Sequence, residues 1–165
     1  YQRASGHATS YDIVDLGYNY RRDDIRASIG VVQLDKLKSD LEKRMEIRKW
    51  YIEFLEGFNK VSIPFLNHHE FTSNYIFPIV LNESTEEKRD LLRTNLQERG
   101  IQTSVHYPAI HRFSAYADYC RKLPNTEYVS DNAITLPMYG KLEKEQVKYI
   151  CTELIECFNE LNQKV

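Results

Sequence analysis

The sequence has little of what marks the specialised classes of protein. Its 165 residues include only three cysteines, five prolines, six glycines and one tryptophan. An odd number of cysteines, with no C-x-x-C pair among them, argues against a disulfide framework and against the common cysteine metal motifs. No apolar run approaches the ~18 residues that a membrane-spanning helix needs. We therefore expect a globular chain without a membrane partner.

Charge of one sign is also lacking. The sequence has 22 basic and 24 acidic residues, which gives a formal net charge of −2. Such a balance provides no basic field to hold a polyanion, so no nucleic-acid partner is expected. No secretory signal is visible, and Cys120, Cys151 and Cys157 are interpreted as small apolar residues of a reducing compartment. A cytoplasmic protein is the expectation.

The N-terminal half is dominated by a helical pattern. Apolar residues recur at helical spacing over residues 25–55, and the aspartate pair just before them offers an N-cap. The S-x-x-E pattern that begins at Ser39 is typical of a capping box. We therefore predict two helices, at about 24–38 and 40–57, and Gly57 is the stop signal of the second. An alanine, a serine and a glycine within the first helix favour close approach of another backbone.

The remaining pattern alternates short strands with helices. Pro78 cannot donate to a strand ladder, so its strand is expected at a sheet edge or at a bulge. Ser84 and Glu87 form a second capping box, and Gly100 is the stop signal of that helix. Few strands among many helices predict an α+β fold, a small sheet packed with helices. The predicted strands are 74–81, 101–107 and 133–137, and the predicted helices are 84–99, 112–120, 126–132 and 143–161.

The stretch LGYNYRRDD concentrates polar side chains immediately before the first helix. Its carboxamide and guanidinium groups are donors that suit phosphate oxygens. A helix N-terminus also favours anions. The alternative is a solvated loop in which aspartates and arginines pair and cap the helix. The donor-bearing candidates are Tyr18, Asn19, Tyr20, Arg21 and Arg22.

A second group of candidates follows the predicted strand 101–107. His106 and Tyr107 would project together at the end of that strand, and His111 belongs to the same loop. The alternative is a surface histidine beside a packing tyrosine. A metal site on the two histidines would need further ligands, which the sequence does not offer nearby. No metal is therefore expected.

Three stretches of the chain resemble, in order, the signature of the DegT/DnrJ-type sugar aminotransferases. They are YDIVDLGYNYRRDDIRASIGVVQLDKL, RGIQTSVHYPAIHRFSAY and AITLPMYGKLEKEQVKYI. The sequence departs from the family pattern at four positions. Arg22 and Asp23 stand where methionine and threonine are commoner, and Ser28 stands where alanine is usual. Glu143 replaces a threonine or serine, so the final helix is expected to lack a good N-cap.

The resemblance implies a pyridoxal-phosphate enzyme of the aspartate aminotransferase fold, fold type I. This chain is similar to the C-terminal portion of such an enzyme, which comprises the small domain and the dimer-facing helices. It implies a polar lead-in and phosphate-contacting loop at 1–22, interface helices at 23–58 and an α+β small domain at 59–165.

The family's cofactor lysine lies upstream of the GYNYR motif, in a segment that belongs with a large N-terminal domain. Lys43 fits the family's S-x-x-x-K pattern by letters alone, but it follows the motif and is interpreted as a surface lysine. We therefore expect no catalytic residue in this chain, no covalent binding of pyridoxal phosphate and no activity of the chain alone.

The resemblance also assigns roles to the candidate residues. It implies that the chain acts in a homodimer and that the asparagine loop reaches the partner's cofactor phosphate. The reaction implied is transfer of an amino group from an amino acid, glutamate for example, to a keto nucleotide sugar. The residues implied to bind the cofactor are Asn19 and Arg21, and those implied to bind the substrate are Tyr18, Tyr20, His106, Tyr107 and His111.

Two other functions remain open at this point. The chain could be a non-catalytic regulatory module that dimerises through residues 25–37. It could also be one half of a split aminotransferase whose other half is a separate chain.

Overall fold

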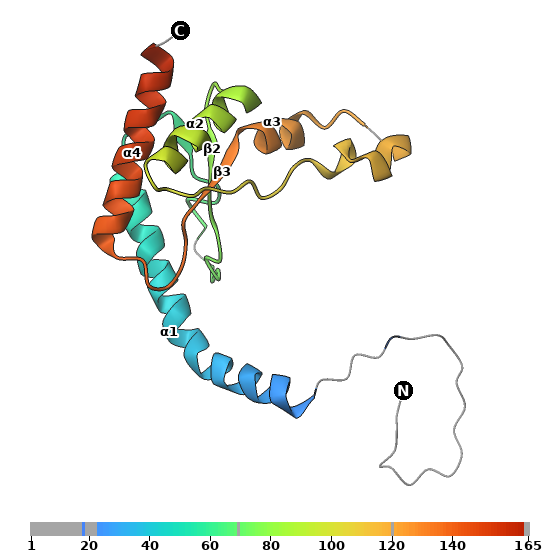
Figure 1. The fold of residues 1–165 in the computed structure, drawn as a ribbon, viewed down its shortest axis with the longest axis vertical. Coiled ribbons are helices and arrows are strands. Elements are labelled where there is room, and N and C mark those ends of the chain that lie inside the picture. The colour runs from blue at the N-terminus through green and yellow to red at the C-terminus, as the bar shows by residue number, and fades with distance from the viewer. Residues whose placement is uncertain (1–17, 19–22, 69, 120, 164–165) are drawn as a thin grey trace. The chain divides into compact units, whose positions relative to one another are not determined.

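The computed structural model describes residue 18 and residues 23–68, 70–119 and 121–163. It places the elements in the order shown in Figure 1, where η denotes a 3-10 helix. The chain divides into two units, residues 1–36 and 37–165. The elements are α1 (Asp24–Phe54), β1 (Val61–Ser62), β2 (Phe77–Leu81), α2 (Glu86–Glu98), η1 (Ile110–Arg112), η2 (Ser114–Tyr119), α3 (Pro124–Asn132), β3 (Ala133–Leu136) and α4 (Lys144–Gln163).

The described part of the first unit is mainly the start of α1. Asp23 caps this helix, because its carboxylate accepts the backbone N–H of Arg26 at 2.8 Å, and the expected aspartate N-cap is confirmed. The apolar side chains of this part are all exposed, so the capped backbone, and not a core, stabilises it within the described residues. Those side chains are Ile25, Ile29, Val31, Val32 and Leu34.

The prediction of two helices before residue 58 is wrong, because α1 is continuous. No proline or glycine interrupts residues 31–56, and the side chains of Asp40 and Arg44 pair along the helix at 2.6 Å. The S-x-x-E pattern at Ser39 therefore lies inside a run of good helix formers and does not start a new helix. The helix ends near Gly57, which has φ of +79°, as the stop signal predicted.

The three strands form one antiparallel sheet in the order β1–β2–β3. The strand that contains Pro78 is the central one, so the prediction of an edge strand is wrong. The short β1 pairs only with Val80 and Leu81, and Pro78 therefore lies in the part of β2 that β1 does not reach. A missing N–H is tolerated there for the reason that it is tolerated at an edge.

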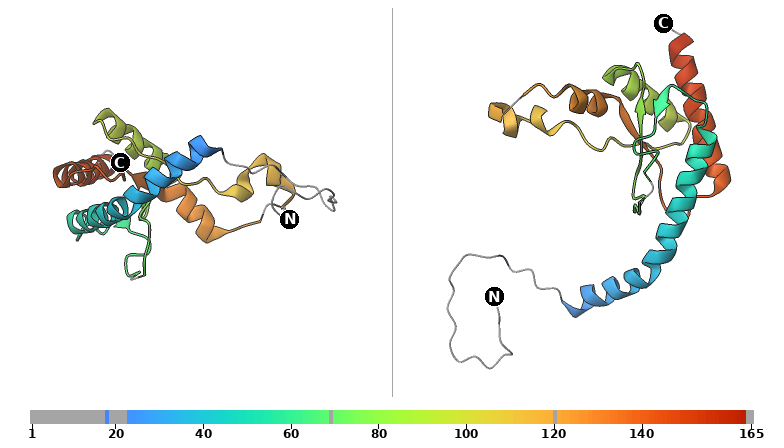
Figure 2. Two further views of the ribbon diagram at one scale, coloured as in Figure 1. Left: turned by 90° about the horizontal axis from the view of Figure 1, so that it is seen from below. Right: turned by 180° about the vertical axis from the view of Figure 1, so that it is seen from behind.

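The core lies where α2, α4 and the second half of α1 pack against this sheet (Figures 1 and 2). Tyr51 of α1 stacks on Phe77 of β2 with ring centroids 4.4 Å apart, and its hydroxyl donates to the carbonyl of Pro137 at 2.7 Å. The buried stripe of α4 includes Val147 and Leu154, as its periodicity predicted. A small antiparallel sheet covered by helices confirms the predicted α+β class.

The helix ends show two capping arrangements that the sequence pattern did not predict. Thr85, and not Ser84, is the N-cap of α2, and its hydroxyl accepts the N–H of Lys88 at 3.3 Å. At the start of α4 the side-chain oxygen of Gln146 accepts the N–H of Glu143 at 3.0 Å, which is one half of a capping box. None of the described helices is both long and apolar enough to cross a membrane.

The strand predicted at 101–107 is reduced to a single bridge between Ser104 and Thr135 of β3. The alternating burial is present, but the ladder is not. Arg93 of α2 takes the carbonyl of Thr103 at 3.3 Å and its hydroxyl at 3.2 Å, and Pro108 has no N–H to offer. The chain therefore leaves the sheet after one bridge and continues as the segment 105–123, which extends to the side opposite α4 (Figure 1).

Candidate functional site

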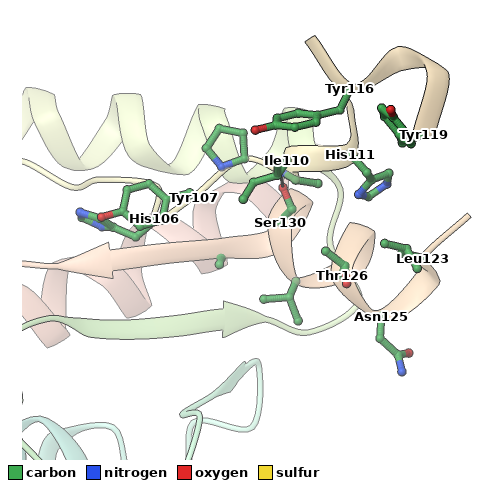
Figure 3. Close-up of a pocket in the computed structure, with 14 residues that line it drawn as sticks. His106, Tyr107, Ile110, His111, Tyr116, Tyr119, Leu123, Asn125, Thr126 and Ser130 are labelled. Carbon is green, nitrogen blue, oxygen red and sulfur yellow. Dashed lines mark hydrogen bonds between the residues drawn. The ribbon is translucent and has the colours of Figure 1, made fainter. Parts of the chain in front are cut away.

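The segment after the bridge encloses an open, mainly apolar groove of about 770 Å³ together with α3. Three substrate-site residues predicted from the sequence line this one groove: His106, Tyr107 and His111 (Figure 3). Its outer wall is made by η1 and η2, which contribute Tyr116 and Tyr119. A groove of this size with aromatic walls and a few polar groups fits a small-molecule ligand.

His106 is held from below by the sheet. Its ring Nδ1 lies 3.0 Å from the hydroxyl of Thr135 on β3. The ring of Tyr107 meets it edge-on, with centroids 5.0 Å apart and planes at 78°. Tyr107 itself is 74% exposed, so the hydroxyl and one ring face are available to a ligand. This pair is therefore fixed on one side and open on the other.

His111 is held from the α3 side. Its Nε2 lies 3.1 Å from a carboxylate oxygen of Glu127, and that same oxygen accepts the backbone N–H of Leu123 at 2.9 Å. The Leu123 N–H and then the His111 ring keep the pKa of Glu127 below its usual range. His111 therefore faces a carboxylate in the groove wall.

Further contacts attach η1 to α3. The guanidinium of Arg112 forms two hydrogen bonds to the carboxylate of Asp131, at 2.5 and 3.0 Å, and this holds the pKa of Asp131 below its usual range. The hydroxyl of Ser130 accepts the N–H of Ala109 at 2.9 Å. Arg89 of α2 is buried and donates to the carbonyl of Ser130 at 2.9 Å. These bonds set the width of the groove.

The predicted phosphate loop falls mostly outside the described residues. Asn19, Tyr20 and Arg21 lie there, and Tyr18 is exposed. The structure therefore brings together the three residues of the second group and does not place the first group beside them.

Neither a metal nor a Schiff-base lysine has a site among the described residues. Within residues 23–68, 70–119 and 121–163, no three histidine, cysteine, aspartate or glutamate side chains gather to hold a metal ion. No lysine of these ranges is buried, and a Schiff-base lysine is usually activated by desolvation. Lys43 pairs with Glu46 at 2.7 Å on the outside of α1, as expected of a surface lysine.

Sequence reasoning missed the residues that support the groove from neighbouring elements. Thr135, Glu127 and Ser130 contact the predicted residues but stand 16 to 29 positions from their partners. No spacing rule links positions that far apart. A second cavity of about 760 Å³, beside the start of α4, was also not predicted, and Tyr139 and Tyr149 are among its lining residues.

Comparison with known proteins identifies the family. Residues 2–155 match the model of the DegT/DnrJ/EryC1/StrS aminotransferase family. The chain belongs to this family. The match covers the groove, both histidines and the predicted phosphate loop.

Individual relatives agree with this membership. The chain is 30% identical over 141 residues to the UDP-4-amino-4,6-dideoxy-N-acetyl-beta-L-altrosamine transaminase of Campylobacter jejuni, covering 84% of this chain and 38% of the relative. Its fold matches PseC of Helicobacter pylori, an aminotransferase involved in the biosynthesis of pseudoaminic acid, with a TM-score of 0.86 and 23% identity over 94% of this chain and 43% of that one. It also matches the Streptococcus pneumoniae protein Spr1654 in its PMP-form, with a TM-score of 0.81 and 29% identity over 95% of this chain and 40% of that one.

The chain thus spans about two fifths of the length of the relatives that it matches. It corresponds to a portion of these longer fold type I aminotransferases, as the sequence resemblance implied.

Proposed function

We propose that this chain is the C-terminal part of a pyridoxal-phosphate-dependent aminotransferase that acts on a keto nucleotide sugar, with glutamate as the amino donor. The observation that carries the proposal is the groove. His106, Tyr107 and His111, which the resemblance assigns to the substrate, line one cavity in a member of an aminotransferase family. The name of the Campylobacter relative, a transaminase of a UDP-linked amino sugar, supports the substrate class.

The groove supplies groups that a nucleotide sugar can use. Imidazole and phenol groups at its rim offer hydrogen bonds to phosphate and sugar oxygens. Tyr116 and Tyr119 offer aromatic faces along the wall for the apolar face of a sugar or for a base. The role proposed for this part of the chain is to bind and orient the substrate.

Pyridoxal phosphate would supply the electron sink that lets the amino group move between carbon atoms. Asn19 and Arg21 carry the donor types that suit its phosphate, and we assign them to it because of the resemblance. None of the described lysines is placed to bind the cofactor covalently, so we propose that the lysine comes from a segment outside this chain.

We also propose a homodimer in which the loop around Asn19 serves the partner's cofactor, with Tyr18 and Tyr20 near the substrate. The exposed apolar side chains at residues 25–34 support this proposal, because a helix with several apolar faces is normally covered. The residue ranges 1–22, 23–58 and 59–165 are then the phosphate loop, the interface helix and the small domain.

The test is amino transfer by the complete protein that contains this chain. With 15N-glutamate as donor, the label should appear in the amino sugar formed from a UDP-linked or dTDP-linked 4-keto sugar, detected by mass spectrometry. His106→Gln should lower kcat/KM for the sugar about tenfold or more, as expected for a lost hydrogen bond to a charged group. His68→Gln, at an exposed histidine of a distant loop, is the control. Label transfer to simple keto acids only would contradict the proposal.

The isolated chain gives a second check on the division of labour. Borohydride reduction in the presence of pyridoxal phosphate should leave its intact mass unchanged at one-to-one stoichiometry. A stoichiometric adduct at a single lysine would show that the chain carries its own cofactor site.

A further inference from the structure

Thr135 occupies a position where its hydroxyl has little choice of partner. It lies on β3 and is 7% exposed. Its backbone N–H and carbonyl are both used by Ser104, at 2.8 and 3.1 Å. Among the described residues the structure gives its hydroxyl one contact, the Nδ1 of His106 at 3.0 Å. The state of the His106 ring therefore decides whether this buried hydroxyl is satisfied.

The direction of that hydrogen bond follows from the cost of an unused buried donor. If the Nδ1 of His106 carried the proton, the hydroxyl of Thr135 would only accept, and its own proton would have no partner among the described residues. If the hydroxyl donates, its proton is used, and Nδ1 must present a lone pair. The proton of the neutral ring is then on Nε2.

We propose that Thr135 is a positioning residue that fixes His106 in its Nε2–H tautomer, so that His106 offers one neutral N–H donor to an oxygen atom of a ligand in the groove. Nε2 is on the opposite side of the ring from Nδ1 and points away from β3. The edge-on ring of Tyr107 limits rotation of the imidazole.

His111 has a different role in the same groove. A carboxylate accepts and does not donate, so the Nε2 that faces Glu127 carries a proton and donates it at 3.1 Å. This N–H is used within the groove wall. His106 is therefore the histidine whose Nε2–H is left for a ligand, and His111 holds the wall in place.

The ligand atom that fits a neutral N–H donor is an acceptor, a phosphate oxygen or a sugar hydroxyl oxygen. That this ligand is a nucleotide sugar rests on the proposed function. The tautomer itself does not, because it is set by contacts within the chain.

The tautomer is read directly by long-range 1H–15N correlation of histidine rings in the 15N-labelled chain, recorded at about pH 8, where free histidine is neutral. His106→Gln identifies the signals of His106, and exposed His68 serves as the reference for an unconstrained ring. The wild-type chain should show His106 with an unprotonated Nδ1 and a protonated Nε2, and no averaging of the kind seen for His68.

Two substitutions at Thr135 sharpen the result. Thr135→Val keeps the shape of the side chain but removes the hydroxyl, and His106 should move towards the averaged pattern of His68. Thr135→Ser restores the hydroxyl and should restore the wild-type pattern. A protonated Nδ1 in the wild-type chain would overturn the proposal, and so would an unchanged pattern in Thr135→Val. The wild-type comparison with His68 does not depend on how well either variant folds.

In the complete protein, Thr135→Val should raise KM for the nucleotide sugar roughly two- to tenfold, as expected for one neutral hydrogen bond, with little change in kcat. Thr94→Val, which removes a hydroxyl that bonds to a helix carbonyl on α2, is the matched control. An unchanged KM would overturn the positioning role. Absence of amino transfer in the wild-type protein, with the tautomer observed as expected, would contradict the proposed function and leave the tautomer standing.

Discussion

The two halves of α1 have similar helical sequences and opposite surroundings. In the first half Ile29 is 58% exposed and Leu34 is 68% exposed, whereas Ile47 and Tyr51 in the second half are fully buried. The second half belongs to the core of its own unit. The first half carries apolar side chains that the described residues do not cover. The difference indicates that one helix serves two purposes, folding in its second half and assembly in its first.

The largest expected effect compares the same substitution in the two halves. Ile47→Ala should lower the free energy of unfolding by about 2–5 kcal/mol, because it leaves a cavity in the core. Ile29→Ala should change it by no more than about 0.5 kcal/mol, as for an exposed position. Urea unfolding of dilute chain, followed by circular dichroism, measures both. Equal losses would show that the first half is covered by its own chain, and the comparison would fail.

The next effect concerns assembly. The isolated chain should self-associate through residues 25–37, because apolar patches of this kind drive association. The double variant Ile25→Gln, Ile29→Gln should weaken this association at least about tenfold, since burial of one such side chain contributes about 1.5–3 kcal/mol. Sedimentation at several concentrations decides it. Leu91→Gln removes an equally exposed apolar side chain from α2 and should leave the association unchanged.

A third effect tests whether the loop before α1 works with the cofactor. In a complete protein, Asn19→Ala should weaken retention of pyridoxal phosphate roughly ten- to a hundredfold, as expected for one hydrogen bond to a charged group. Equilibrium dialysis with detection of the cofactor's absorbance gives the affinity. Asn159→Ala, on the exposed face of α4, should have no effect. Equal affinity in both variants, with the dimer intact, would remove Asn19 from the site.

Glycines in the two units should respond in opposite directions. A Cβ at Gly30 of α1 would meet nothing within 4 Å, so Gly30→Ala should stabilise the isolated chain by up to about 1 kcal/mol through helix propensity. A Cβ at Gly140 would clash with the carboxylate of Asp40, which is paired with Arg44. Gly140→Ala should therefore destabilise the chain, by about 1–3 kcal/mol. Thermal or urea unfolding separates the two signs.

The same Gly30→Ala variant also refines the assembly hypothesis. If small residues at the start of α1 allow close approach of a partner, the variant should be more stable as a chain and weaker as an assembly. Sedimentation of the variant beside the wild-type chain checks this. An unchanged association would mean that the partner contacts another face of the helix.

The sequence predicted the fold class and most elements, because both depend on local periodicity and on stop signals such as Gly57 and Gly100. It failed where tertiary contacts decide. The S-x-x-E pattern at Ser39 predicted a helix start that neighbouring helix formers override. The alternation of residues 101–107 predicted a strand, but Arg93 takes the carbonyl of Thr103 that a ladder would need.

The candidate site divides in the same way. His106, Tyr107 and His111 were predicted because they fall within a few positions of one another and within a family motif. Their supports, Thr135 and Glu127, come from β3 and α3 and are brought to them only by the fold. Local spacing in a sequence carries no information on which distant hydroxyl or carboxylate will face a given ring.

The smallest expected effect concerns acid and the attachment of η1 to α3. The folded-state pKa of Asp131 is lowered by Arg112, and that of Glu127 is lowered by the Leu123 N–H and by His111. A lowered folded-state pKa means that the contribution to stability is complete above the ordinary carboxyl pKa, near 4. It is lost as the pH falls through the folded-state value. Asp131→Asn should therefore destabilise the chain at pH 7, and its difference from wild type should shrink as the pH falls towards about 3. Urea unfolding across this range, with the exposed Asp118→Asn as control, measures the difference, and a difference that grows in acid would contradict the assignment.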